Sequence, residues 1–317
     1  MNALKYRHII LAAGIFFAFA TSAPAWHGKG HYDVALLALR AARTDGNLPA
    51  FFHAGARTVA HSSLDPDNFT RPIAPNALHR AESPEHFFDV ELLAEANMPP
   101  NRYEFIDLCY RRKLKPNRVG LLPYAITEWT QRLTVTFAEY RKYPDNPTIR
   151  AKCLLHAGML AHYAADLCQP LHVTIHYDGR ATGGKSPRSG IHAKVDALLG
   201  KLAGDANAPS PGKPFDANSL LAGMRPVAFK AVLPATMAEL RKSSALVGRV
   251  YDLEKQIPAE AAPIAPGSAV EKFSAERMQA AGKFTASLYL TAWHDSADIK
   301  LPWWYRRPYN PPGTAAP

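Results

Sequence analysis

Residues 162–172 read His-Tyr-Ala-Ala-Asp-Leu-Cys-Gln-Pro-Leu-His, and this stretch predicts where a long helix ends and which side chains meet beyond its end. His162 and Asp166 are four residues apart, so both lie on the same face of a helix. Pro170 cannot continue the helix, which is therefore expected to end just before it. The turn that follows can bring His172 back into the space that His162 and Asp166 face.

The rest of the sequence predicts an all-α protein. Asn146-Pro147 caps the helix that carries His162, which is expected over about 148–167. No segment shows the apolar–polar alternation of a β-strand. Other helices are expected over 31–43, 123–140, 192–199 and, from a cap at Ser274, 274–293, with weaker signal over 220–256 interrupted by Pro226 and Pro234.

Long loops are predicted between the helices. Residues 62–84 are interpreted as a loop because Pro72 and Pro75 break regular structure, and 177–190 as a glycine-rich loop. Two further loops are expected at 203–217 and 258–267. These segments and the helices form a single mainly helical domain.

The first 25 residues have the pattern of an export signal. Lys5 and Arg7 precede an unbroken apolar run over 9–20, and Ala23-Pro24-Ala25 is a small-x-small cleavage site. The run is too short for a permanent anchor, although a retained anchor is the alternative. We therefore expect cleavage between Ala25 and Trp26 and a secreted or periplasmic protein. The expected division is a signal peptide at 1–25, one domain at 26–301 and an irregular tail at 302–317.

The chain is basic, with 37 Lys and Arg against 27 Asp and Glu. Loss of Lys5 and Arg7 with the signal leaves an excess of eight positive charges. Such an excess suits nucleic acids or an anionic lipid surface, but it also serves solubility alone. The net charge therefore does not decide the partner.

The cysteines do not account for a metal site. Cys153 and Cys168 are expected on one helix, about 22 Å apart at 1.5 Å per residue, which is too far for a disulfide. Any bridge would therefore involve Cys109. Because the three thiols form no plausible thiolate site, metal ligands must come from His and Asp.

A second His–Asp pair repeats the spacing of the first. His192 and Asp196 are four residues apart on another expected helix. Imidazole nitrogens and carboxylate oxygens, without thiolates, are typical of hydrolytic zinc sites with open positions. A single pair is often a cap or a surface pair, but two pairs flanking a turn with a third His favour a metal centre.

The expected mature N-terminus adds a third group of ligands. It reads Trp26-His27-Gly28-Lys29-Gly30-His31. The freed α-amino group and the carbonyl of Trp26 can chelate one metal in a five-membered ring, with His31 as a further ligand. An α-amino pKa near 8 makes loss of its proton to a metal easy at neutral pH.

Taken together, these motifs resemble the superfamily of zinc-dependent phospholipases C and fungal-type single-strand-specific nucleases. Members are mainly helical, keep an N-terminal Trp and hold three zinc ions in a cleft. The resemblance covers 26–199 by motifs and the last helix by general character. The matching positions are Trp26 with His31, then His162, Asp166 and His172 in a motif ending Gln-Pro-Leu-His, then His192 with Asp196.

The resemblance implies two more ligands. One is His86, which begins His86-Phe87-Phe88-Asp89. The other is an Asp in the preceding loop, for which Asp65 and Asp67 are both candidates. The family pattern Asp-x-x-basic favours Asp67, but Arg71 lies one residue late, so both remain open.

Three zinc ions are the cofactors that the resemblance implies. The first would be held by Asp67, His86, His162 and Asp166. The second would be held by the amine and carbonyl of Trp26, His31 and the other oxygen of Asp166. The third would be held by His172, His192 and Asp196.

The implied activity is hydrolysis of phosphate esters, as a phosphodiesterase or phosphomonoesterase. A hydroxide shared by the first two ions would attack phosphorus, and the third ion would neutralise the leaving oxygen. Asp166 would bridge two ions, and Asp67 would accept a proton. No serine or cysteine nucleophile is implied.

The substrate is expected to be single-stranded nucleic acid or nucleotides, which makes the protein a nuclease or 3′-nucleotidase. In the nuclease branch, residues at the positions of Phe87 and Asp89 stack on a base and bind its edge. Stacking contributes about 1–3 kcal/mol per base. Core packing of Phe87 is the alternative interpretation.

A phospholipase C is the alternative function. Gly190-Ile191-His192-Ala193-Lys194 resembles the lipase branch, and Val195 stands where the nuclease branch usually has Trp. Gly183-Gly184 resembles the nuclease loop, but Lys185 replaces its usual Asn. A non-enzymatic zinc-binding protein is the second alternative, disfavoured by open coordination positions. No protein partner is implied, and we expect a monomer.

Overall fold

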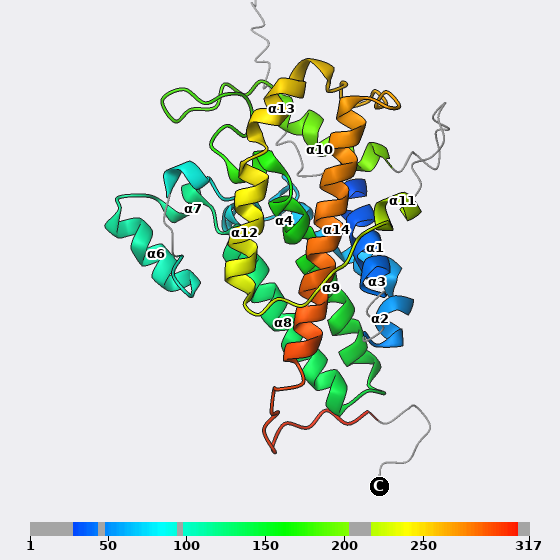
Figure 1. Ribbon diagram of the computed structural model, residues 1–317. Helices are drawn as coiled ribbons and strands as arrows, with labels where there is room; N and C mark the ends of the chain where they lie inside the picture. The colour runs from blue at the N-terminus through cyan, green and yellow to red at the C-terminus, as the bar shows by residue number, and fades with distance from the viewer. Residues whose placement is uncertain (1–27, 44–47, 94–97, 203–216, 310–317) are drawn as a thin grey trace, which may run out of the picture.

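The computed structural model describes residues 28–43, 48–93, 98–202 and 217–309, and these residues form helices joined by loops (Figure 1). Within those ranges there is no β-strand, only three isolated bridges. The predicted fold class, mainly helical, is confirmed. The signal segment, Trp26 and the end of the tail lie outside the described residues.

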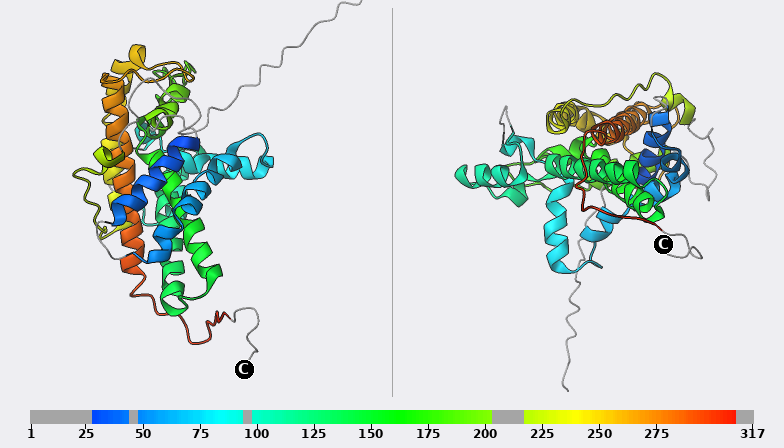
Figure 2. Two further views of the ribbon diagram at one scale, coloured as in Figure 1. Left: turned by 90° about the vertical axis from the view of Figure 1, so that its right-hand side faces the viewer. Right: turned by 90° about the horizontal axis from the view of Figure 1, so that it is seen from below.

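Three long helices form the centre of the molecule. They are α8 (Leu122–Lys142), α9 (Pro147–Leu167) and α14 (Ala269–Asp295), and they lie side by side in both views of the bundle (Figures 1 and 2). Helix α1 (Gly28–Ala42) packs against α14 and α9, and α3 (Ala56–Ser62) packs against α9. Helix α9 is therefore covered on several sides.

The sequence features of α9 account for this central position. The Asn146 side chain accepts hydrogen bonds from the backbone N–H groups of Thr148 and Ile149, as its expected cap role requires. Every residue from 157 to 167 is buried. At Gly158 a Cβ would lie 2.5 Å from Ser62 Cβ, so the close approach of α3 requires glycine. Consequently, the half of α9 that carries His162 and Asp166 lies inside the core.

Residues 62–84 are mostly helical, so the prediction of a loop there was wrong. They contain α4 (Asp65–Thr70), α5 (Asn76–Glu82) and the start of η2 (Ser83–His86). Pro66 and Pro84 lie in the first turns of α4 and η2. A backbone N–H has no partner within the helix at these positions, so proline is tolerated there. Pro72 and Pro75 lie between helices, where they separate α4 from α5.

The cap of the last helix was also predicted wrongly. Helix α14 begins after Ser268, whose side chain accepts a hydrogen bond from Glu271 N–H. Ser274 lies inside the helix and donates to the Val270 carbonyl 2.7 Å away. A serine hydroxyl can bond back to the carbonyl four residues earlier, so a serine alone does not mark a helix start.

The other helix predictions agree with the structure within a few residues. The helix around 192–199 is α10 (Ile191–Leu202), and Pro234 falls in the first turn of a helix rather than interrupting it. The segment 220–256 contains α11 (Ala217–Leu221), α12 (Val232–Ser244), α13 (Val247–Leu253) and η5 (Glu254–Gln256). Short helices without a prediction are α2 (Ala50–Ala54), α3, η3 (Val90–Leu92), α6 (Arg102–Arg111), α7 (Pro116–Val119) and η4 (Pro170–Val173).

Helices α6 and α7 form an arm that projects from the side of the bundle (Figures 1 and 2). Arg102, at the start of α6, forms ion pairs with Glu85 and Glu128. The Tyr124 hydroxyl donates to the Pro99 carbonyl at 2.9 Å. These contacts attach the arm to η2 and α8.

The described part of the tail, 302–309, is irregular as expected. It is held by hydrogen bonds that Lys142 and Tyr143 donate to the Tyr305 carbonyl. All three cysteines are free and buried, so no disulfide contributes to the described fold. Among the described helices, none combines the length and the hydropathy needed to cross a bilayer.

Candidate metal centre

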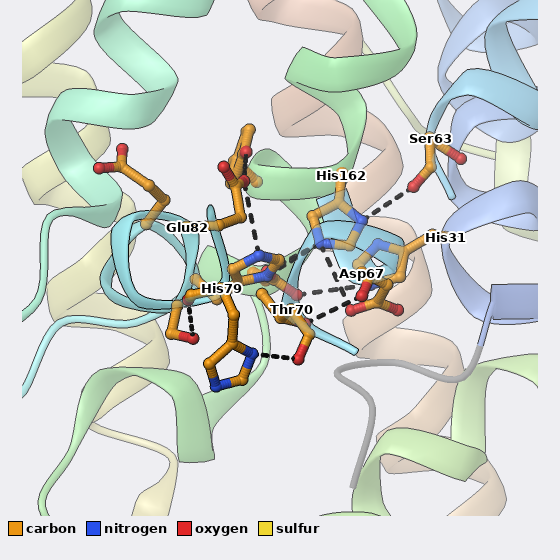
Figure 3. A network of polar contacts seen from close by, with 12 residues as sticks. His31, Ser63, Asp67, Thr70, His79, Glu82 and His162 are labelled. Carbon is orange, nitrogen blue, oxygen red and sulfur yellow. Dashed lines mark hydrogen bonds and ion pairs between the residues drawn. The ribbon is translucent and has the colours of Figure 1, made fainter. Parts of the chain in front are cut away.

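The predicted ligand side chains come together where α1, α4, η2 and α9 meet. His31, Asp67 and His162 point toward one another (Figure 3). We call the group formed by His31, Asp67, His86, His162 and Asp166 the inner cluster. Beside it, η4 and α10 contribute the outer cluster, which consists of His172, His192 and Asp196.

Asp166 is the centre of the inner cluster. Its Oδ2 lies 3.0 Å from His86 Nδ1 and 3.3 Å from His162 Nε2, whereas its Oδ1 lies 3.5 Å from His31 Nε2. The side chains of Asp166, His31 and His162 are inaccessible to solvent. The two oxygens of one carboxylate thus face two different sets of imidazoles.

Of the two candidate aspartates in the preceding segment, Asp67 belongs to the inner cluster. Its Oδ1 lies 3.9 Å from His162 Nε2, and the residue is 3% exposed. Asp65 is not among the grouped side chains. The two residues are two positions apart on α4, so their side chains point in nearly opposite directions.

The nitrogen–oxygen distances in the outer cluster are similar to those in the inner cluster. Asp196 Oδ1 lies 3.6 Å from His172 Nε2, and Asp196 Oδ2 lies 3.1 Å from His192 Nε2. Gln169, from the Gln-Pro-Leu-His motif, donates a hydrogen bond of 2.7 Å to Asp196 Oδ1 and holds the carboxylate in place. His172 Nδ1 also lies 3.6 Å from Asp166 Oδ1, so the two clusters are adjacent.

The polar atoms of these clusters are arranged as metal ligands would be. Buried polar atoms in proteins almost always have hydrogen-bond partners. Separations of 3.0–3.9 Å between facing atoms are close to the about 3.3 Å between ligand atoms of a tetrahedral zinc ion. Buried cluster atoms without a hydrogen-bond partner among the described residues include His31 Nε2, His172 Nε2, Asp67 Oδ2, Asp166 Oδ1 and Asp196 Oδ2.

Backbone carbonyls fix the orientation of three imidazoles. His162 Nδ1 bonds to the Ser63 carbonyl at 2.8 Å, His172 Nδ1 to the His86 carbonyl at 2.8 Å and His192 Nδ1 to the Tyr177 carbonyl at 3.2 Å. A carbonyl accepts, so Nδ1 carries the proton in each ring. The Nε2 lone pair is then free to face its cluster, as in metal sites whose outer contacts set the tautomer.

His86 is oriented by a carboxylate instead. Its Nδ1 faces the cluster, and its Nε2 lies 3.7 Å from Glu82 Oε1. The Tyr163 hydroxyl donates to the same Glu82 oxygen. Neither Glu82 nor Tyr163 was predicted from the sequence, although the four-residue spacing of Glu82 and His86 was a visible signal.

The pKa values of Asp166, Asp196 and His31 favour metal binding. By contrast, against the effect of burial, attraction from Asp166 raises the pKa of His162 and raises that of His172 to about 9. Burial alone would raise the pKa of Asp166, but His162 and His172 hold it well below its usual range. Burial opposes ionisation of Asp196 as well, yet His192 and His172 lower its pKa overall. Burial, followed by repulsion from His162, lowers the pKa of His31. Ionised carboxylates and a neutral imidazole are the forms that bind metal.

A cavity of about 1180 Å³ opens onto both clusters. Asp67, His86, His172 and His192 line it, whereas the other cluster members lie behind its wall. Four cations also line this cavity: Arg71, Arg118, Lys185 and Arg188.

The predicted base-binding residues lie on the cavity wall. Phe87 lines the cavity and is partly exposed, whereas its neighbour Phe88 is fully buried in the core. Core packing therefore describes Phe88 and not Phe87. Asp89 also lines the cavity, and burial together with the charge of Glu91 raises the pKa of Asp89 to about 7.

Eight of the nine predicted ligand residues are thus grouped in two adjacent clusters. Trp26, the ninth, lies outside the described residues, which begin two positions later. The clusters could hold metal ions through His nitrogens and Asp oxygens. No protein-family model, curated protein or solved structure matches the chain.

Proposed function

We propose that this chain is an exported zinc hydrolase of the phospholipase C and single-strand nuclease type, with single-stranded nucleic acid or nucleotides as its substrate. One observation carries the proposal. Two adjacent clusters of inward-facing His and Asp atoms, many without hydrogen-bond partners among the described residues, lie at the wall of a cavity that is also lined by cations.

The donor atoms favour three zinc ions. Imidazole-rich sites with a few carboxylates suit zinc, whereas magnesium and calcium prefer oxygen. Asp67, His86, His162 and Asp166 would hold one ion, and His172, His192 and Asp196 another. His31, Asp166 and the N-terminal amine and carbonyl of Trp26 would hold the third. Bound zinc supplies an acidified water at neutral pH and stabilises negative charge on phosphate oxygens.

The protein's own groups supply the positioning. Asp166 fixes the distance between two binding positions because its two oxygens face different imidazoles. Asp67 reaches the cavity, and its Oδ2 has no hydrogen-bond partner within the described chain. We assign to this oxygen the acceptance of the proton that the attacking water loses.

The cavity wall favours a nucleotide substrate. Phe87 offers an aromatic face on which any base can stack, and Asp89 offers a carboxylate for hydrogen bonds to a base edge. The cations Arg71, Arg118 and Arg188 can bind phosphates that are not being cleaved. Hydrolysis would thus act on a phosphate held beside an anchored base.

A phospholipase C is the second candidate, and one observation favours it. Leu92 and Ile175 line the same cavity, are partly exposed and could contact acyl chains. The phosphate chemistry would be the same, but a zwitterionic headgroup would make little use of the cationic wall.

The test uses the mature protein, beginning at Trp26 and loaded with zinc. Its substrates are a single-stranded oligonucleotide, a 3′-nucleotide and phosphatidylcholine vesicles, with Asp166→Asn as the inactive control. We expect hydrolysis of the first two, lost on chelation and restored by zinc. Hydrolysis of phosphatidylcholine alone would instead support the phospholipase. Full zinc content with no hydrolysis of any of the three would indicate a zinc-binding protein.

A further inference from the structure

Residues 111–118, at the junction of α6 and α7, carry a dense positive charge. They read Arg-Arg-Lys-Leu-Lys-Pro-Asn-Arg, and all five basic residues are exposed. Arg111 forms an ion pair with Asp107. We call three of the others, Lys113, Lys115 and Arg118, the basic strip.

The basic strip is continuous with the cavity. Arg118 lines the cavity and contributes to the electrostatic environment of Asp89. The residues after it are fixed to the cavity wall, since Asp89 N–H donates to the Val119 carbonyl at 2.7 Å and Leu121 N–H donates to the Pro84 carbonyl at 2.7 Å. The strip therefore begins at the wall that carries Phe87 and Asp89 and leads outward along the arm (Figure 1).

The backbone at two of the surrounding cations is unusual. Within the described ranges, only two non-glycine residues have positive φ, Lys113 at 57° and Arg188 at 55°. Glycine adopts this conformation without strain, whereas a side chain makes it costly. At Lys113 the conformation ends α6 in a Schellman motif, in which Lys113 N–H donates to the Tyr110 carbonyl and Leu114 N–H donates to the Cys109 carbonyl. One of these two cations is in the strip, and the other lines the cavity.

Exposed aromatic rings accompany the strip. Tyr103 is 81% exposed and Tyr110 is 66% exposed. They are seven residues apart on α6, which is about two turns, so they lie on one face of the helix. Surfaces that bind single-stranded nucleic acid combine cations, which bind phosphates, with exposed aromatic rings, on which bases stack.

We infer that the basic strip binds the sugar-phosphate backbone of a single-stranded nucleic acid beyond the nucleotide held in the cavity. The inference rests on the proposed function for its link to hydrolysis, although the binding itself can be measured separately. An anionic membrane fits the surface less well. The exposed rings are tyrosines rather than long aliphatic side chains, and the cations lead into a cavity instead of forming a flat face.

The binding test uses fluorescence anisotropy of a labelled single-stranded 12-mer with the full mature protein in EDTA, where no hydrolysis occurs. The variant is Lys113→Gly/Lys115→Gln. Its matched control, Lys272→Gln/Lys283→Gln, removes the same charge from exposed positions of α14 outside the cavity lining. Circular dichroism and thermal melting check folding, and Lys113→Gly suits the positive φ of its position.

We expect the strip variant to bind the 12-mer about tenfold more weakly at moderate salt, and the control to bind within about twofold of the unaltered protein. The slope of log Kd against log salt should fall by about 0.7 for each lost phosphate contact. Equal weakening in both variants would show a diffuse charge effect and overturn the inference. So would unchanged binding in the strip variant, or strip-dependent binding to phosphatidylglycerol vesicles without binding of the 12-mer.

A second measurement links the strip to hydrolysis. In the zinc-loaded protein, the ratio of kcat/KM for the 12-mer to that for a dinucleotide should fall about tenfold in the strip variant. An unchanged ratio in an active enzyme would overturn the role of the strip in substrate binding. If the unaltered protein cleaves neither substrate but binds the 12-mer through the strip, the proposed function fails and the binding surface stands.

Discussion

The inner and outer clusters use the same four-residue His–Asp spacing but lie in different surroundings. His162 and Asp166 sit on the part of α9 that is buried on all sides, with His31 stacked on His162 at a ring distance of 3.8 Å. The outer rings, His172 and His192, are 4.9 Å apart, and both line the cavity. His192 keeps 18% of its side chain exposed.

The same local spacing therefore places one His–Asp pair inside the core and the other beside the cavity. Ions in the inner cluster would join α1, α4, η2 and α9, so we expect them to stabilise the fold, because a ligand that binds only the native state adds to its stability. An ion in the outer cluster would join only η4 and α10, next to solvent. We expect the outer ion to act mainly on substrate. The following predictions test this division.

Replacing the shared carboxylate should have the largest effect. Asp166→Asn removes a ligand of both inner positions, so we expect loss of both inner ions, a drop in hydrolysis of more than about 100-fold and a lower melting temperature than that of the zinc-loaded unaltered protein. Elemental analysis and thermal melting measure these changes. Asp65→Asn, on α4 but outside the cluster, is the control and should keep its zinc. Full metal content in Asp166→Asn would contradict the bridging role.

Replacing the outer carboxylate should separate catalysis from stability. In Asp196→Asn we expect loss of one ion and a fall in activity of more than about 100-fold, because the zinc proposed for the outer cluster would no longer be held beside the substrate phosphate. The melting temperature should fall by less than in Asp166→Asn, since the inner ions remain. An equal or greater fall in melting temperature would mean that the two clusters do not differ as their surroundings indicate.

Replacing Glu82 should have a smaller effect than replacing any of the predicted metal ligands. Glu82→Gln weakens the orientation of His86, and loss of such an outer partner typically costs 10–100-fold in metal affinity. We expect zinc affinity, measured by competition with a chelator, to fall within that range while the metal-free protein keeps its fold. Glu276→Gln, which alters only an exposed pair with Arg249, should leave affinity unchanged. A similar affinity in both variants would assign Glu82 a structural role only.

The smallest effect is expected at Asp89, on the cavity wall outside both clusters. Its pKa is raised to about 7 by burial and by Glu91, with Arg118 opposing, so between about pH 4 and 7 the native state holds a proton that the unfolded state has lost. Stability from this group therefore falls as pH rises through that range. Asp89→Asn should remove this pH-dependent loss of stability. The free energy of unfolding of the variant should show no gain over that of the unaltered protein near pH 4 and should exceed it by about 1–3 kcal/mol above pH 7.

Urea unfolding of the metal-free protein at several pH values measures the Asp89 effect. Asp252→Asn, at an exposed position of α13, serves as a control for loss of one carboxylate and should show no such trend. A stability difference for Asp89→Asn that is constant with pH would contradict the raised pKa.

Much of the site could be predicted from local spacing. The Asn146 cap, the end of the helix before Pro170 and the two His–Asp pairs follow from helix geometry, which repeats every 3.6 residues regardless of the surrounding fold. The same local reasoning was wrong for 62–84, because a proline that breaks a helix interior also starts a helix. It was wrong for Ser274, because a hydroxyl can bond backward within a helix as well as cap one.

Local patterns in the sequence were thus enough to predict the helical class, the His and Asp side chains of both clusters and the order of the motifs. Only the tertiary structure decided that Asp67 rather than Asp65 faces His162, that Phe87 rather than Phe88 reaches the cavity, and that Glu82 contacts His86. The physical reason is that spacing along one helix sets which side chains share a face. The packing of α4, α5 and α9 decides which of these faces come into contact, and these helices lie up to about 100 residues apart in the chain.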